Sequence, residues 1–131
     1  MNLILLHCLL AWLCAQGIKV LLCCFNHSFK LERCVGTGGM PSSHSSTVAC
    51  LATSIFIQDG ISSSTFAIAF IFAFIVVYDA LNLRYQCGLH VKQINEINAE
   101  LHRSVQLNES LGHCMCEVIA GCMIGIIIAG I

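Results

Sequence analysis

Four apolar segments alternate with polar stretches along this chain of 131 residues. They cover roughly Leu3–Phe25, His44–Ile57, Ser63–Leu81 and Met115–Ile131. A helix needs about 20 mostly apolar residues to cross a bilayer, and the first and third segments meet that length. The second and fourth are shorter or more mixed, so we expect them to lie partly inside a bundle. We therefore predict an all-α fold: a multi-pass transmembrane helical bundle of about four spans, forming a single domain over residues 1–131.

A further helix is predicted between the third and fourth segments. Its apolar residues are Val91, Ile94, Ile97, Leu101 and Val105. Spacings of three, three, four and four residues place them on one face of an amphipathic helix. We expect this helix to lie along the membrane surface.

Composition supports the membrane assignment. Hydrophobic residues make up 57% of the chain and charged residues 10%, whereas soluble domains contain roughly 25% charged residues. We therefore expect an integral membrane protein of a bacterial inner membrane or an equivalent one, in contact with membrane lipid. The net charge of −1 gives no basis for a nucleic-acid partner.

The ten cysteines do not indicate a disulfide framework or a metal site. Most lie within the apolar segments, where cysteine behaves as a small hydrophobe. Cys114 and Cys116 follow His113, but zinc sites use a C-x₂₋₄-C pair together with a second ligand pair. No such second pair is evident, so we expect no metal and no other cofactor. The sequence does not indicate an oligomeric state.

The stretch Gly38–Ser45, directly before the second apolar segment, is the most informative motif. Pro41 suits the first turn of a helix, because its missing N–H would be unpaired there. We expect the N–H groups of Ser42, Ser43 and His44 to point outward, where a helix start binds anions such as phosphate. His44 can also move a proton. The simpler alternative is a helix cap beside an incidental histidine.

Threading four spans through a bilayer gathers the other polar candidates on the same side as this motif. The polar stretches Asn26–Ser43 and Asn82–Gly112 fall on that side, while Gln58–Ser62 and both termini fall on the other. The candidate site residues that come together are Lys19, Ser42, Ser43, His44, Asp79, Arg84, His113 and Glu117. Ionisable groups inside membrane spans are costly and usually functional.

His113 and Glu117 are four residues apart, so they share one face of a helix. A carboxylate beside an imidazole fixes its tautomer and supports its positive form, as a histidine nucleophile requires. The same spacing also fits a pair that only satisfies itself. Asp79 with Arg84 also fits a plain ion pair, and Lys19 also fits a side chain that snorkels to the interface.

These motifs resemble the divergent PAP2 family, small bacterial and plant membrane proteins distantly similar to type 2 phosphatidic acid phosphatases and vanadium haloperoxidases. The residues that carry the resemblance are Ala15–Val20, Gly38–Ser45, Asp79-Ala80 with Arg84, Gln86 and Gly88, and Leu111-Gly112-His113 with Glu117, Val118 and Gly121.

The resemblance implies a metal-independent acid phosphatase that acts on a phosphate-bearing lipid or small molecule. His113 would attack phosphorus and form a phosphohistidine, Glu117 would orient it, and His44 would protonate the leaving group. The phosphate-binding residues implied are Lys19, Ser42, Ser43, Asp79 and Arg84.

The chain departs from the phosphatase pattern at several positions. Ser43 replaces a glycine and Glu117 an aspartate, and the arginine expected before the last motif is absent. Asn82 and Tyr85 replace a glycine and an arginine of the divergent family. These losses leave a second possibility open: an inactive membrane protein that binds phosphate or lipid headgroups, or a purely structural one.

The basic residues indicate an orientation. The six Lys and Arg residues are Lys19, Lys30, Arg33, Arg84, Lys92 and Arg103. All lie on or toward the motif side, and the positive-inside rule places that side in the cytoplasm.

Overall fold

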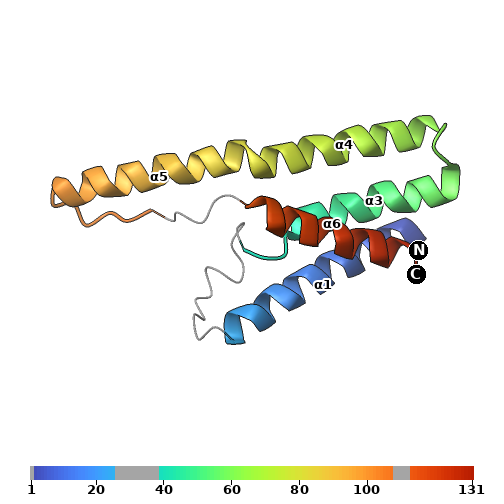
Figure 1. Cartoon of the computed structure of the whole chain (residues 1–131), viewed down its shortest axis with the longest axis horizontal. Helices are drawn as coiled ribbons and strands as arrows, with labels where there is room; N and C mark the ends of the chain where they lie inside the picture. The colour runs from blue at the N-terminus through green and yellow to red at the C-terminus, as the bar shows by residue number, and fades with distance from the viewer. Residues whose placement is uncertain (1, 26–38, 108–112) are drawn as a thin grey trace.

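In a computed structural model of the chain, the described residues form helices and no strands, which confirms the all-α prediction (Figure 1). The helices are α1 (Leu3–Phe25), α3 (Ser43–Asp59), α4 (Ser64–Leu81), α5 (Leu83–Glu100) and α6 (Met115–Ala129). Four of them coincide with the four apolar segments to within about two residues, the usual uncertainty of helix ends.

The structure describes residues 2–25, 39–107 and 113–131. Five residues used in the sequence predictions lie outside these ranges: Lys30, Arg33, Gly38, Leu111 and Gly112.

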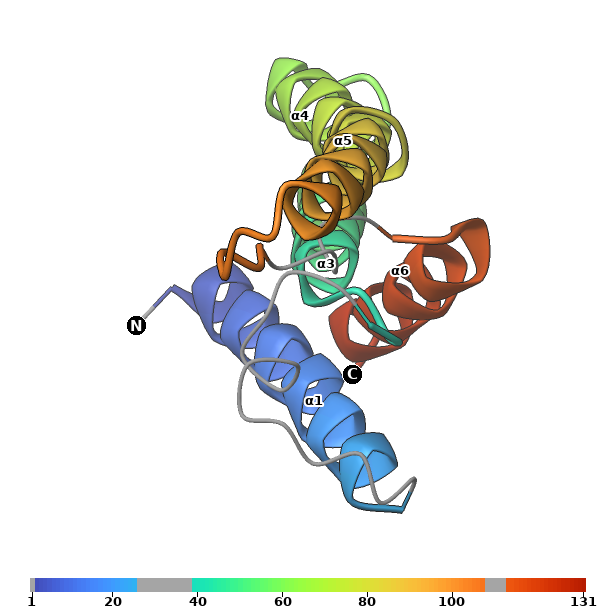
Figure 2. The same ribbon diagram turned by 90° about the vertical axis from the view of Figure 1, so that its left-hand side faces the viewer.

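Helix α3 is the centre of the bundle. It packs against α1, α4 and α6, which Figure 2 shows arranged around it. Both termini and the α3–α4 turn lie at one end of the bundle (Figure 1). The starts of α3 and α6 and the end of α4 lie toward the other end, so the candidate site residues share one end of the molecule.

Two helical stretches have the length and apolar character of a membrane span. They are α1 and the continuous run Ser64–Glu100, of 23 and 37 residues. Only 22% and 11% of their most apolar windows are buried in the protein, unlike the core helices of a soluble domain. Helices α3 and α6 have 17 and 15 residues. The number of spans therefore stays a prediction.

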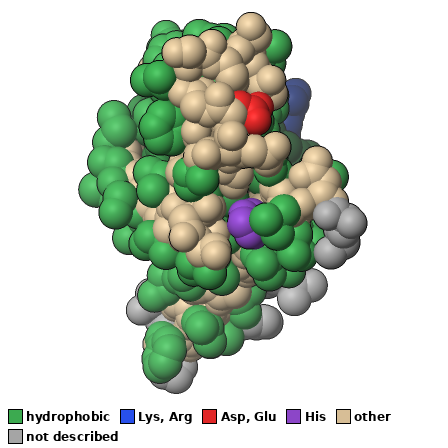
Figure 3. Space-filling view, turned by 90° about the vertical axis from the view of Figure 1, so that its right-hand side faces the viewer, with side chains coloured by type: hydrophobic (Ala, Val, Ile, Leu, Met, Phe, Trp, Pro, Cys, Tyr) green, Lys and Arg blue, Asp and Glu red, His purple; other side chains and the backbone are tan. Residues whose placement is uncertain are grey.

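The surface and the interior have opposite compositions. Large apolar side chains such as Phe70 and Ile127 are exposed, and hydrophobic groups cover much of the end that carries the termini (Figure 3). Buried positions hold small residues, among them Ala11, Ser46 and Cys50. The Ser46 hydroxyl donates to the Ala11 carbonyl over 3.1 Å, which satisfies a buried polar group inside the protein, as lipid surroundings require.

Helix α6 approaches α3 through two glycines. A Cβ added at Gly121 would meet the Ser42 carbonyl, and one added at Gly125 would meet the Ser46 carbonyl and lie 2.8 Å from the Cys50 nitrogen. Both glycines therefore let the two backbones touch.

The helix predicted between the third and fourth apolar segments is present, with bounds that differ from the expected ones. It begins at Leu83 and ends at Glu100, so Leu101 and Val105 lie beyond it. Figures 1 and 2 show α5 continuing the axis of α4 instead of turning across it. The reason is local: Asn82 keeps a right-handed helical conformation, with φ −109° and ψ −68°, and no proline or glycine interrupts the join.

Replacing Gly125 with alanine tests the close contact of α6 with α3. We expect Gly125→Ala to lower the free energy of unfolding in detergent by about 1–3 kcal/mol, because the new methyl group forces the backbones apart. Gly17→Ala is the matched control, since an added Cβ there meets nothing within 4 Å. Equal thermal unfolding midpoints for the two variants would contradict the contact.

Candidate functional site

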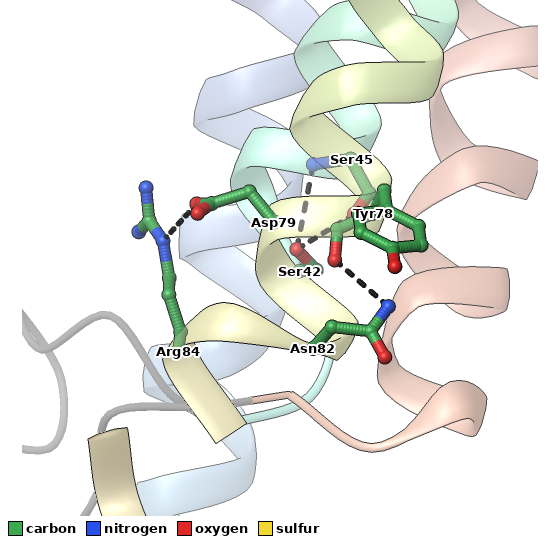
Figure 4. Close-up of polar contacts among 6 residues, drawn as sticks. All are labelled: Ser42, Ser45, Tyr78, Asp79, Asn82 and Arg84. Atoms are coloured by element: carbon green, nitrogen blue, oxygen red, sulfur yellow. Dashed lines mark hydrogen bonds and ion pairs between the residues drawn. The ribbon is translucent and has the colours of Figure 1, made fainter. Parts of the chain in front are cut away.

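The start of α3 is held by Ser42. Its backbone is extended, with φ −72° and ψ 112°, and it is the N-cap residue, so the helix begins at Ser43. The Ser42 hydroxyl accepts hydrogen bonds from the Ser45 N–H at 3.4 Å and from the Ser45 hydroxyl at 2.9 Å (Figure 4). The placement of Pro41 within the first turn is therefore wrong, because a serine cap begins the helix one residue later.

The Ser42 backbone connects α3 to α6. Its N–H donates to the Glu117 carbonyl over 3.0 Å. The expectation of a free N–H at Ser42 is therefore wrong. The N–H is bonded because α6 approaches α3 closely at Gly121. The next two N–H groups, of Ser43 and His44, have no acceptor among the described residues. They remain as donors at the positive end of the helix.

His113 lies just before α6, is buried and makes two hydrogen bonds. Its side chain is buried, with the residue 2% exposed, and its N–H donates to the Ala80 carbonyl at 3.4 Å. Its Nδ1 lies 2.9 Å from Glu117 Oε2, which also accepts from the Cys114 N–H at 3.1 Å. Because a carboxylate oxygen only accepts, the hydrogen of a neutral His113 ring belongs on Nδ1.

This tautomer leaves an available lone pair on His113 Nε2. Nε2 is buried and has no hydrogen-bond partner among the described residues. Buried polar atoms are nearly always paired, so an unpaired one in a fixed ring calls for an explanation such as a ligand or a catalytic role.

His44 lies in the first turn of α3 with its side chain exposed. The charges of Arg84, Lys19 and Asp79 and the ring of His113 are all close enough to act on its imidazole. His44 therefore lies within electrostatic reach of groups on α1, α4 and α5 and of His113.

Lys19 reaches this region from inside the bundle. It is only 3% exposed, and its Cδ and Cε lie 3.9 Å from the position of a Cβ at Gly39. Gly39 has φ +96°, which favours glycine. The lysine stem thus runs beside the segment that leads into α3.

Asp79 and Arg84 join α4 to α5. Arg84 Nε lies 2.7 Å from Asp79 Oδ2, with side chains 34% and 31% exposed (Figure 4). Exposed ion pairs contribute about 0–1 kcal/mol to stability, so the pair serves mainly to orient the guanidinium. Only Nε of that group is bonded among the described residues, which leaves the two Nη groups to bind an anion.

The predicted site residues therefore divide into two groups. In one group, Arg84, Lys19, Asp79 and His113 act electrostatically on His44, and Glu117 binds His113. The Ser42 hydroxyl is committed to capping, and Ser43 is buried, 6% exposed.

Among the described residues, no group of three His, Cys, Asp or Glu side chains has a metal-binding arrangement.

Sequence reasoning missed two backbone partners of the site. The Ala80 carbonyl holds His113, and the contact at Gly121 allows Glu117 to reach Ser42. The four-residue spacing of Gly121 and Gly125 was the sequence signal for the contact that lets Glu117 reach Ser42. It did not indicate which helix the glycines face. A backbone carbonyl has no sequence signal.

The fixed tautomer of His113 can be tested by nitrogen NMR. In protein labelled with ¹⁵N-histidine, we expect His113 to show a protonated Nδ1 and an unprotonated Nε2 when neutral, while exposed His90 on α5 shows a mixture of tautomers. In Glu117→Gln the single tautomer should be lost, because an amide can both donate and accept. A protonated Nε2 in the neutral ring would contradict the assignment.

Comparison with known proteins agrees with this reading of the chain. The sequence matches the Divergent PAP2 family over residues 1–128. It is 37% identical over 145 residues to the uncharacterized membrane protein YuiD of Bacillus subtilis (strain 168), covering 97% of this chain and 91% of that protein. No solved structure matches significantly. The resemblance noted in the sequence is confirmed: the chain belongs to the divergent PAP2 family, and its relative is a membrane protein.

Proposed function

We propose that this protein hydrolyses phosphomonoesters of lipid-linked or otherwise amphiphilic alcohols, with His113 as the nucleophile. The observation that carries the proposal is the buried Nε2 of His113, which has no partner among the described residues while Glu117 binds Nδ1. A nucleophile needs a free lone pair, a fixed orientation and a group that stabilises the charge it develops. His113 and Glu117 supply all three.

The reaction proceeds in two steps. Nε2 of His113 attacks phosphorus, the bond from phosphorus to the alcohol oxygen breaks, and protonated His44 gives its proton to that oxygen. Water then attacks the phosphohistidine, His44 takes a proton from the water, and inorganic phosphate leaves. Glu117 stabilises the positive ring of His113 between the two steps, as a carboxylate does for an imidazolium.

The cations near His44 bind the phosphoryl group in this proposal. Lys19 and Arg84 both act electrostatically on the His44 region, and the N–H groups of Ser43 and His44 add donors at the helix start. Positive groups that face the equatorial oxygens supply most of the stabilisation in phosphoryl transfer. Asp79 orients Arg84 and does not itself bind the anion.

One observation favours a second function, phosphate or headgroup binding without hydrolysis. The N–H and hydroxyl of Ser42 are both committed within the protein, so the site has fewer anion donors than the motif suggests. A site of this kind still binds phosphate but stabilises the transition state less. Turnover distinguishes the two functions.

Histidine variants test the hydrolytic function. In detergent-purified protein, we expect His113→Ala to lower kcat/KM for an aryl phosphate by about a thousandfold or more, because the covalent step is lost. His44→Ala should cost about 10²–10⁴ in kcat for alkyl phosphates and much less for aryl phosphates, whose leaving groups need no proton.

His90→Ala, at an exposed position of α5, is the matched control and should keep full activity. Equal activity of the wild type and His113→Ala would refute the nucleophile. Phosphate binding without any turnover would favour the binding function.

The proposal includes an orientation with the site facing the cytoplasm. Lys92 lies on α5 and Arg103 in the chain that follows it. Lys30 and Arg33 belong to the other connection expected on the same side. None of these four basic residues is assigned to phosphate binding, so they indicate the orientation independently of the proposed site. At the opposite end, Asp59 is the last residue of α3, and the α3–α4 connection after it contains no charged residue. Lys and Arg in short loops favour the cytoplasmic side.

Cysteine labelling tests the orientation. In a variant without native cysteines, we expect Ser63→Cys to react with a membrane-impermeant thiol reagent added to intact cells, and Ser104→Cys to be protected. Permeabilised cells are the control, because both cysteines should be labelled there. Labelling of Ser104→Cys alone in intact cells would reverse the orientation.

A further inference from the structure

A groove of about 390 Å³ opens between α3, α4 and α6. Its walls are made almost wholly of apolar side chains, including Val48, Ala52 and Phe56 of α3, Ala73 and Val77 of α4, and Ile126 of α6. Its volume lies within the range of about 300–1,000 Å³ that small-molecule sites occupy. The site described above does not use it.

The α3 wall of the groove begins at the site. Val48, Ala52 and Phe56 are each four residues apart, so they form one row along the helix. The residue four positions before Val48 is His44. The same row of α3 therefore carries the proton donor at its head and the apolar groove below it.

The α4 wall leads to His113. Ala73 and Val77 line the groove, and Ala80, one turn after Val77, accepts the hydrogen bond from the His113 N–H. Two walls from different helices thus lead to the two histidines.

Aromatic rings close the far end of the groove. Phe56 of α3 and Phe66 of α4 have ring centroids 5.5 Å apart, and Phe66 and Phe70 are 5.9 Å apart. Phe56 lies eight residues after Val48, which corresponds to about 12 Å along a helix. The groove therefore extends along α3, with aromatic rings at the end far from His44.

We propose that this groove binds the hydrocarbon chain of the leaving alcohol and that Phe56 and Phe66 limit the chain length that fits. The inference rests on the proposed function. When the bond from phosphorus to the alcohol oxygen breaks, that oxygen must face His44 to receive a proton. The carbon chain attached to it then continues along the row below His44, and only apolar walls receive it there.

Small side chains keep the groove open. Ala52 and Ala73 lie midway along opposite walls, so a larger residue at either position shortens the space for a chain. We therefore assign chain-length specificity to the middle of the groove and to the aromatic pair at its end.

Substitutions within the groove test this assignment. The ratio of kcat/KM for hexadecyl phosphate to that for p-nitrophenyl phosphate should fall about tenfold or more in Ala73→Phe, because the ring occupies the groove. Ala67→Phe, on an exposed position of the same helix, should keep the wild-type ratio. Phe56→Ala should raise the ratio of kcat/KM for hexadecyl phosphate to that for octyl phosphate. This variant tests the assignment even if Ala73→Phe does not fold.

Photolabelling supplies a readout that does not need turnover. A hexadecyl phosphonate with a diazirine at the end of its chain should label groove residues of α3 and α4 in bilayer nanodiscs. Inorganic phosphate and Ala73→Phe should reduce that labelling, and Ala67→Phe should not. Labelling of outward helix faces that neither phosphate nor Ala73→Phe changes would overturn the proposal in favour of ordinary lipid contact.

The two proposals fail in different ways. Hydrolysis of p-nitrophenyl phosphate with unchanged chain-length preference in Ala73→Phe and Phe56→Ala would refute the groove and leave the hydrolytic function standing. Phosphate-sensitive labelling of the groove without any hydrolysis would support the groove and refute catalysis.

Discussion

The contact of α6 with α3 through Gly121 and Gly125 is the constraint on which the site depends. With no side chain at either position, the carbonyls of Ser42 and Ser46 touch the α6 backbone. This approach allows the Ser42 N–H to bond to the Glu117 carbonyl, and Glu117 in turn holds His113. Lipid gives no hydrophobic drive for helices to associate, so close backbone packing of this kind is what joins them. The orientation of a candidate nucleophile thus follows from the absence of two side chains, one and two turns beyond Glu117.

Polar residues in the interior have a matching role. Ser42, Ser45 and Ser46 are fully buried at the start of α3, yet each hydroxyl has a partner within the protein. A serine is small enough to permit close helix packing and polar enough to satisfy a backbone group that water cannot reach. The serine-rich motif therefore builds the start of α3 as much as it forms a site. In the proposed function, His44, Lys19 and Arg84, which come from different helices, bind the anion instead.

The sequence predicted the helices well because apolar runs and their polar interruptions set helix length directly. The runs Leu3–Phe25 and Ser63–Leu81 correspond to α1 and α4 almost residue for residue. The start of α3 was misplaced because two rules competed there, and the serine cap at Ser42 outweighed the preference of Pro41 for the first turn. The pairing of His113 with Glu117 was predicted from helical spacing, but His113 precedes α6, so the pair forms across the start of the helix and not along one of its faces. The Ala80 carbonyl and the helix that faces Gly121 depend on tertiary packing, which no local pattern encodes.

The unbroken join of α4 and α5 has a consequence for the path of the chain. Ser64–Glu100 has 37 residues, so the rod is about 55 Å long. A hydrocarbon layer is about 30 Å thick, so the rod is longer than one membrane crossing needs. The chain after α5 turns back beside that helix as far as residue 107, and Asn95 and Asn98 bind it there. Asn95 bonds both the N–H and the carbonyl of Leu107, and Asn98 donates to the Val105 carbonyl. These two asparagines therefore satisfy backbone groups of residues 105 and 107, which lie outside any helix or strand.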